Sequence, residues 1–178
     1  MELKGTHTQA NLLVAYSGES QAAEKYAIYA AKARAEGYAQ IADILDETAA
    51  NEREHAKLWF KLLNGGISDT AANLADAAHG EEYEWSQMYP AFAAAAKEEG
   101  FEHIALLMER IAAIEKRHEE RFRALQRNVE TGTVFSKPQP QKWICSKCGY
   151  VHEGESAPEV CPVCAHKQEH YEILCENY

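Results

Sequence analysis

Proline, cysteine and basic residues are scarce in most of this 178-residue chain, and each shortage excludes a class of protein. Residues 1–131 hold one proline, Pro90, and no cysteine, so a disulfide framework is excluded there. No apolar run approaches the roughly 18 residues of a membrane span. The 18 Lys and Arg residues face 28 Asp and Glu residues, and the net charge of −10 argues against nucleic acid or an anionic membrane as a partner.

The first residues, "MELKGTHTQANLL", show no signal-peptide pattern, so we expect a cytoplasmic protein. Composition then divides the chain. Residues 1–131 are rich in Ala, Glu and Lys, whereas residues 143–178 are aromatic and hold all five cysteines. Pro138 and Pro140 lie between these parts and are typical of a semi-extended linker. We predict a helical domain over 1–131, a linker over 132–142 and a small metal-binding domain over 143–178.

Apolar residues recur at helical spacing in the first part and predict four helices. Gly37 and Gly100 are expected at helix ends, and Asp69 or Thr70 is expected to cap the third helix. The expected helices run from about Gln9 to Ala35, Tyr38 to Leu63, Asp69 to Glu99 and Phe101 to Thr131. Packed face to face, they predict an all-α four-helix bundle.

An internal repeat relates the two halves of the helical part. The stretch "EGYAQIADILDETAANEREH" (36–55) aligns with "EGFEHIALLMERIAAIEKRH" (99–118), 63 positions further on. Upstream, Gly18-Glu19 aligns with Gly80-Glu81 only after a slip of one residue. Each half is therefore predicted to be a helical hairpin of the same design.

Each predicted helix carries a glutamate in the middle of its apolar stripe, and the second and fourth helices add a histidine three residues later. A lone Glu-x-x-His pair is usually solvated, but two at matching repeat positions favour a shared function. Four carboxylates brought together repel one another unless cations lie among them. Ferritin-like di-iron bundles have this arrangement. The predicted ligands of the di-metal site are Glu19, Glu52, His55, Glu81, Glu115 and His118.

Glu84 breaks the symmetry of the repeat. It follows Glu81 by one helical turn, and its counterpart in the first half is Ala22. Glu84 is therefore a candidate seventh ligand. The alternative is that it belongs with Glu82 to an exposed charged run, "GEEYEW".

The tail predicts a second metal site of a different kind. Two C-x-x-C pairs separated by 12 residues suit a tetrahedral iron or zinc ion, and spacing alone does not distinguish the two metals. Backbone N–H groups near Gly149 and Ala165 are expected to point at the sulfurs. Cys175 lacks a partner and is expected to be a small buried residue. The predicted ligands are Cys145, Cys148, Cys161 and Cys164.

The motifs together resemble those of the rubrerythrin family over the whole chain. The matching stretches are "AYSGESQA", "ANEREHAK", "GEEYEWSQMYPAFA", "EEGFEHIA", "EKRHEERF", "CSKCGYVHEGESAPEVCPVCAHKQEHYEIL" and the final "ENY". The resemblance implies a ferritin-like di-iron bundle fused to a rubredoxin-like domain with short β-strands. It also implies a cytoplasmic homodimer that reduces hydrogen peroxide to water and protects against oxidative stress.

The resemblance also implies a role for individual residues. Tyr26 and Tyr89 align with tyrosines that line the di-iron site, and the tail metal is expected to be one iron held by four cysteines. That iron would return electrons to the bundle from rubredoxin or an NAD(P)H-linked reductase. The two non-haem irons of the bundle would be bound by Glu19, Glu52, His55, Glu81, Glu84, Glu115 and His118.

Two other functions stay open from the residues alone. The first is a ferroxidase or iron-handling protein, which would not need an electron-donating tail. The second is a non-catalytic interaction module with a zinc ribbon, in which the tail metal only stabilises a small fold.

The connection between the predicted hairpins is short, since only "ISDTA" separates "LNGG" from "ANLADAAHGE". The eight residues from Asn64 to Ala71 stretch to at most about 28 Å, whereas the second helix is about 39 Å long. We therefore expect a domain-swapped homodimer. The alternative is an unswapped bundle with an extended crossover.

Overall fold

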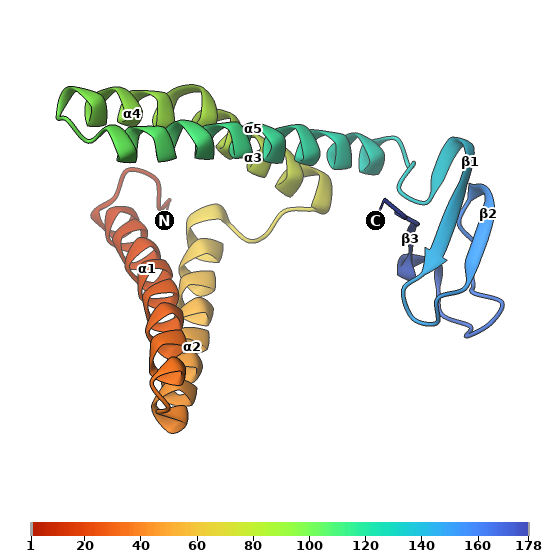
Figure 1. Cartoon of the computed structure of the whole chain (residues 1–178), viewed down its shortest axis with the longest axis horizontal. Coiled ribbons are helices and arrows are strands. Elements are labelled where there is room, and N and C mark those ends of the chain that lie inside the picture. Colours follow the sequence, from red (N-terminus) through yellow and green to blue (C-terminus); the bar gives the residue numbers. More distant parts are fainter. Residues whose placement is uncertain (1, 178) are drawn as a thin grey trace. The chain divides into compact units, whose positions relative to one another are not determined.

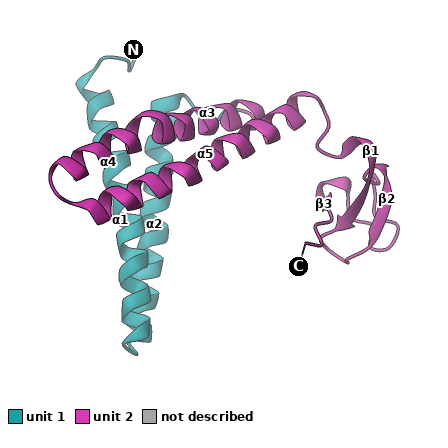
Figure 2. Cartoon of the chain, turned by 45° about the horizontal axis from the view of Figure 1, so that its top comes forward, with its two compact units in different colours: residues 1–68 teal, residues 69–178 magenta. Residues whose placement is uncertain are grey.

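The computed structural model describes residues 2–177, and most of this part of the chain is helical (Figure 1). The chain forms two compact units, residues 1–68 and 69–178 (Figure 2). In chain order the helices are α1 (His7–Ala35), α2 (Ala39–Asn64), α3 (Thr70–Tyr83), the π-helical turn η1 (Glu84–Met88), α4 (Tyr89–Glu98) and α5 (Glu102–Glu130). The four predicted helices are confirmed, with a π-helical turn inside the third. Over the residues described, no helix is both long and apolar enough to cross a membrane.

The first unit is a hairpin in which α1 and α2 lie side by side (Figure 1). Its buried residues are alanines: Ala23, Ala30 and Ala33 on α1, and Ala42, Ala49 and Ala56 on α2. Spacings of seven or three residues return to nearly the same side of a helix, so these alanines form a stripe along each helix. Small side chains in this stripe let the two helices approach closely.

The stripe of α2 that carries Glu52 lies beside this alanine stripe and is only partly covered. Leu45 packs against the buried alanines, but Ile41 and Leu62 are 53% and 56% exposed. The hairpin therefore uses one face of α2 for its own packing and leaves much of the glutamate-bearing face open.

Glycines end the helices where the sequence predicts them. Gly37 and Gly100 follow α1 and α4 with φ of 86° and 84°, a conformation that costs other residues about 1–2 kcal/mol. Asp69 is the N-cap of α3, and its side chain accepts a hydrogen bond from the N–H of Ala72 at 2.9 Å.

The second hairpin repeats the packing of the first. Its buried alanines Ala93, Ala96 and Ala105 lie 63 positions after Ala30, Ala33 and Ala42. Glu81, in contrast, lies only 62 positions after Glu19. One extra residue therefore lies between Glu81 and Ala93, and η1 lies in this interval. A π-helical turn holds one residue more than an α-helical turn, so η1 explains the slip in the repeat.

The C-terminal part of the second unit is a small antiparallel sheet with strand order β2-β1-β3. Its core contains Trp143, Ala157 and Tyr171, and the indole N–H of Trp143 donates to the carbonyl of Gly154 at 3.0 Å. The elements are β1 (Ser136–Cys145), β2 (Val151–Ser156), the 3-10 helix η2 (Gln168–His170) and β3 (Tyr171–Ile173). The predicted small domain with short strands is confirmed.

The expected linker over 132–142 is wrong in its second half, because β1 begins at Ser136. Ser136 pairs with Ser156, and regular pairing with β2 resumes only at Gln141. Pro138 and Pro140 lie within this irregular stretch, where their missing N–H groups interrupt no regular ladder. A strand that begins irregularly has the proline content of a linker, which explains the error.

The alanine stripe predicts a size limit at the hairpin interface. Ala49→Leu should lower the free energy of unfolding by about 1–3 kcal/mol, because Ala49 is 1% exposed and a larger side chain forces the helices apart. Urea unfolding followed by far-UV circular dichroism measures this change. Ala50→Leu adds the same atoms at an exposed position and should change stability by less than about 0.5 kcal/mol. Equal effects at both positions would contradict the packing role of the stripe.

Candidate metal centres

The first hairpin brings one histidine and two glutamates together. His55 Nδ1 lies 2.8 Å from Glu52 Oε2 and 3.9 Å from Glu19 Oε1. One ligand atom from each of the three residues lies within 4.8 Å of the other two. Glu52 and His55 share a face of α2 because they are three residues apart, and Glu19 reaches them from α1.

The second hairpin contains the same arrangement. His118 Nδ1 lies 2.7 Å from Glu115 Oε2 and 3.6 Å from Glu81 Oε2, and the three ligand atoms again lie within 4.8 Å of one another. The residues that align in the repeat thus take up matching geometry in both hairpins. The structure brings the six predicted ligands together in two groups of three.

The chemistry of these clusters suits a cation. Burial raises the pKa of Glu81, and the charge of Glu115 raises it further, while His118 acts in the opposite direction. A cation placed among these groups would remove the repulsion between the two carboxylates. Carboxylate oxygens with imidazole nitrogen are a donor set that iron, manganese and zinc accept. The residues present therefore fit the metal pair that the resemblance implies.

Glu84 and Tyr89 lie near the second cluster. Burial raises the pKa of Tyr89, and the charge of Glu84 raises it further, followed by those of Glu115 and Glu81. Glu84 also contributes to the raised pKa of Glu81. Glu82 lies elsewhere, in contact with Arg123 and not with the cluster. Glu84 is not among the three residues whose ligand atoms lie within 4.8 Å of one another, and its role as a ligand stays a prediction.

Tyr26 lies on α1, two turns after Glu19, and is half-buried. The Lys25 ammonium lies 5.5 Å from the centre of its ring. The roles of Tyr26 and Tyr89 beside bound metals both stay predictions.

Four sulfur atoms converge at the end of the sheet. Cys145 Sγ lies 3.7 Å from Cys164 Sγ, and Cys148 Sγ lies 3.6 Å from Cys161 Sγ. All four ligand atoms lie within 4.8 Å of one another. A tetrahedral ion with metal–sulfur bonds of about 2.3 Å requires sulfur–sulfur distances of about 3.8 Å. The predicted tetrathiolate site is therefore formed, and its size fits iron or zinc.

Hydrogen bonds already favour the thiolate form at one of these sulfurs. Burial opposes ionisation of Cys161, but the nearby Tyr171 hydroxyl and the N–H groups of Cys164 and Val163 outweigh it and lower the pKa of Cys161 to about 6. The Tyr171 hydroxyl is itself buried, and no hydrogen bond of regular geometry reaches it in the part of the chain described.

In each C-x-x-C pair, the N–H group that bonds to the second cysteine belongs to the residue just after Gly149 or Ala165, near which such groups were expected. The N–H of Tyr150, just after Gly149, bonds to Cys148, and the N–H of His166, just after Ala165, bonds to Cys164. His166 is expected from the sequence to be a solvated histidine; it is exposed, but its Nδ1 also lies 3.3 Å from Cys164 Sγ. Its position two residues after a knuckle cysteine, like that of Tyr150, was the available signal.

The expectation for Cys175 is wrong. It is exposed rather than buried, and its thiol lies 3.1 Å from Asn177 Oδ1. It follows β3 and lies beyond the small core that Trp143 and Tyr171 form, so nothing packs over it there.

Two carboxylate–histidine clusters on helical hairpins, followed by a four-cysteine domain, define a ferritin-like metal protein with a rubredoxin-like tail. The comparisons agree: residues 10–126 match the family model described as rubrerythrin, and residues 143–172 match that of the rubrerythrin rubredoxin-like domain. The chain belongs to the rubrerythrin family.

Full-length relatives support this assignment. The chain is 47% identical over 192 residues to rubrerythrin-1 of Clostridium acetobutylicum, covering 99% of this chain and 98% of that protein. It is 48% identical over 188 residues to the rubrerythrin of Nitratidesulfovibrio vulgaris, with the same coverage. A solved structure of nigerythrin in a mixed-valence state is 32% identical, covers 97% of this chain and 89% of its own, and superposes with a TM-score of 0.36.

The turn after the second C-x-x-C pair contains a residue in a strained backbone conformation, so a stabilising substitution can be predicted there. Ala165 has φ of 58°, in the left-handed region, where the matching Gly149 has φ of 77°. Ala165→Gly should raise the stability of the metal-loaded domain by about 0.5–1 kcal/mol, because the steric cost of the left-handed form exceeds the entropic cost of glycine. Denaturant unfolding followed by the absorption of the metal–thiolate bonds measures the change. Gly149→Ala is the reverse substitution and should destabilise the domain; a loss of stability in both variants would contradict the strain.

Proposed function

We propose that the protein reduces hydrogen peroxide to water at a di-iron site in its helical part and receives electrons through an iron ion bound by the four cysteines. The observation that carries this proposal is the presence of both kinds of site in one chain: two matching carboxylate–histidine clusters and one tetrathiolate. Reduced rubredoxin or an NAD(P)H-linked reductase would be the electron donor. The role would be protection of the cytoplasm against oxidative stress.

The chain's own residues would hold the metals and manage protons. Ferrous ions bound as a pair supply the two electrons and the Lewis acidity that cleavage of an O–O bond requires. Glu52 and Glu115 are the least exposed carboxylates of their clusters, at 19% and 15%, and would hold the metals where water is most restricted. The raised pKa of Tyr89 keeps its hydroxyl protonated beside Glu84, so it can donate a hydrogen bond to a peroxide oxygen.

The tail would supply electrons one at a time. Iron at the four sulfurs changes oxidation state, whereas zinc does not, so the proposal requires iron there. The nearby Tyr171 hydroxyl and backbone N–H groups stabilise thiolate charge at Cys161 and would favour the reduced, more electron-rich site.

Separate variants at the two sites test this division of labour. Cys161→Ser should abolish steady-state peroxide reduction with a reductase supplied, yet leave a single oxidation of the prereduced bundle. Glu52→Ala should abolish both. Stopped-flow absorption and a peroxide assay measure the two activities, and a metal count with a visible spectrum shows whether the tail holds red ferric iron. Normal turnover in Cys161→Ser would contradict the electron relay.

The outcomes also separate the alternatives. A colourless tail with zinc in the parent chain would favour the interaction module. Oxidation of added ferrous iron that is unaffected by Cys161→Ser, with no peroxide turnover, would favour the ferroxidase or iron-handling protein.

We also propose that the functional unit is a homodimer with exchanged hairpins. Only residues 65–69 connect α2 to α3, and five residues extend to at most about 18 Å. In a ferritin-like bundle this connection would have to run back along α2, whose 26 residues make a helix of about 39 Å. Exchange between two chains avoids that return. It would also cover the exposed Ile41 and Leu62 on the glutamate-bearing face of α2.

Mixed dimers test the exchange. When Glu52→Ala and Glu115→Ala chains are refolded together, each mixed exchanged dimer would contain one intact and one doubly altered site. The mixed dimers should therefore show about half of the parent's specific activity, and a randomly paired equimolar mixture about a quarter. Each variant refolded alone is the control and should stay inactive. Mixed dimers proven by mass spectrometry but without activity would exclude the exchange.

A further inference from the structure

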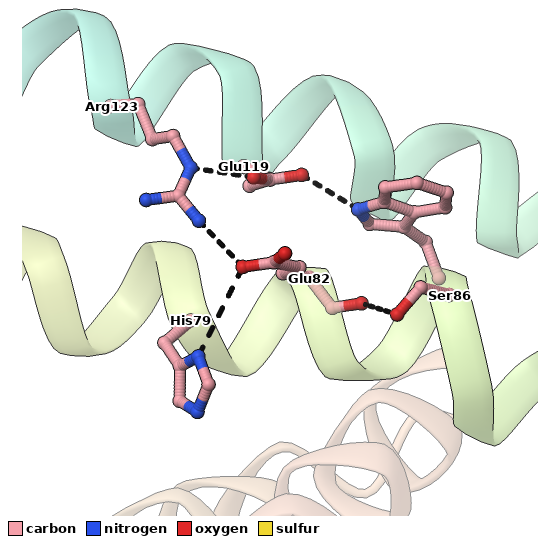
Figure 3. A network of polar contacts seen from close by, with 6 residues as sticks. His79, Glu82, Ser86, Glu119 and Arg123 are labelled. Atoms are coloured by element: carbon pink, nitrogen blue, oxygen red, sulfur yellow. Dashed lines mark hydrogen bonds and ion pairs between the residues drawn. The ribbon is translucent and has the colours of Figure 1, made fainter.

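A polar network connects the helices of the second hairpin (Figure 3). The indole N–H of Trp85 donates to Glu119 Oε2 at 2.7 Å, and Arg123 Nε donates to Glu119 Oε1 at 2.5 Å. The Arg123 guanidinium also donates to Glu82 Oε2 at 2.6 Å, and His79 Nδ1 lies 4.0 Å from the same oxygen. The network thus joins α3 and η1 to α5.

Both oxygens of Glu119 are used within this network. Its side chain is only 12% exposed, and its two oxygens accept from Trp85 and from Arg123 at 2.7 and 2.5 Å. A hydrogen bond between a guanidinium and a carboxylate is stronger than one between neutral groups. Glu119 therefore connects Trp85 firmly to α5.

The first hairpin has no equivalent of this network. The residues that align with Trp85 and Glu119 in the repeat are Ala23 and Ala56, which are 3% and 7% exposed. Arg123 aligns with Phe60. Packing of two helices of this design thus works with alanine at these positions, so the network is not needed to form a hairpin.

The network is attached to the chain next to two candidate ligands. Trp85 directly follows Glu84 and lies within η1, and Glu119 directly follows His118 on α5. A π-helical turn is less stable than an α-helical one, and its extra residue can in principle move along the helix. Moving it by one position would turn the side chains in between by about 100°. The direction of Glu84 therefore depends on what holds the turn in place.

We propose that Trp85, Glu119 and Arg123 are positioning residues that fix the π-helical turn and thereby direct the Glu84 carboxylate toward Glu81 and His118. The inference rests on the proposed metal centre and adds to it the device that holds its seventh ligand. Trp85 provides the attachment on η1, and Glu119 provides the acceptor on α5. Arg123 donates to both Glu119 and Glu82 and so holds the acceptor in place.

The test measures metal binding by the full-length chain. One equivalent of zinc first fills the four thiolates, and Mn(II), which prefers carboxylate and imidazole ligands, is then titrated and followed by the EPR signal of the free ion. Trp85→Phe removes the N–H but keeps an aromatic ring beside Lys116, whose ammonium lies 5.3 Å from the ring centre. We expect Trp85→Phe to weaken one of the two Mn(II) sites of the bundle about tenfold and to leave the other unchanged.

A double-mutant cycle separates positioning from general stability. Glu84→Ala should weaken the same Mn(II) site, and the Trp85→Phe/Glu84→Ala chain should bind no more weakly than Glu84→Ala, because the indole acts through that carboxylate. A purely structural role would give additive losses. Thermal unfolding of each variant confirms that the chain is folded.

A matched pair on α5 provides the control. Glu119→Gln alters the acceptor of the network and should weaken the same Mn(II) site, and it keeps the test available should Trp85→Phe not fold. Glu120→Gln makes the same change of charge one residue further on, at an exposed position, and should leave Mn(II) affinity within twofold of the parent. If Trp85→Phe and Glu119→Gln leave the Mn(II) affinity unchanged, or if the losses in the cycle are additive, the positioning role is wrong but the proposed metal centre stands. A parent chain that binds no Mn(II) in the bundle would overturn the proposed metal centre as well.

Discussion

Repulsion between carboxylates is the constraint on which the helical part depends. Glu52 and Glu115 lie on helix faces that otherwise carry apolar residues, and each is met by a second glutamate from the neighbouring helix. The raised pKa of Glu81 shows the cost, since burial and the charge of Glu115 both oppose its ionisation. Groups of this kind are retained at such positions when a cation offsets the repulsion. The helices thus give up apolar packing at their centres to provide ligands.

The packing of each hairpin is arranged around this constraint. Ala42, Ala49 and Ala56 hold α2 against α1, while Glu52 and His55 lie on the adjacent face. Because the residues that stabilise the hairpin differ from those of the carboxylate–histidine cluster, the clusters form within each hairpin without filling its core. The same separation explains why the glutamate-bearing faces are only half covered, and why the proposed function requires two hairpins to meet.

The sequence predicts most of the fold and the grouping of the site residues, because these follow from periodicity and from the repeat. Gly37 and Gly100 mark helix ends, and the knuckle cysteines lie at tetrahedral distances. The errors have physical causes. Pro138 and Pro140 resemble a linker although β1 begins irregularly around them. The network of Glu119 was missed because its repeat counterpart is an alanine, so nothing in the alignment marks it. Tertiary hydrogen bonds of this kind leave no periodic signal.

A single extra residue accounts for the difference between the two hairpins. Ala93 and Ala96 must face α5 as Ala30 and Ala33 face α2, and Glu81 must reach its cluster as Glu19 does. In an uninterrupted α-helix one added residue would turn one of these sets by about 100° relative to the other. The π-helical turn absorbs that rotation, so both sets keep their directions. The π-helical turn lies between the two sets. Within it the second hairpin carries Glu84 and Trp85, where the first hairpin has Ala22 and Ala23. The asymmetry of the candidate site and the network beside it therefore arise at the same irregularity in the helix.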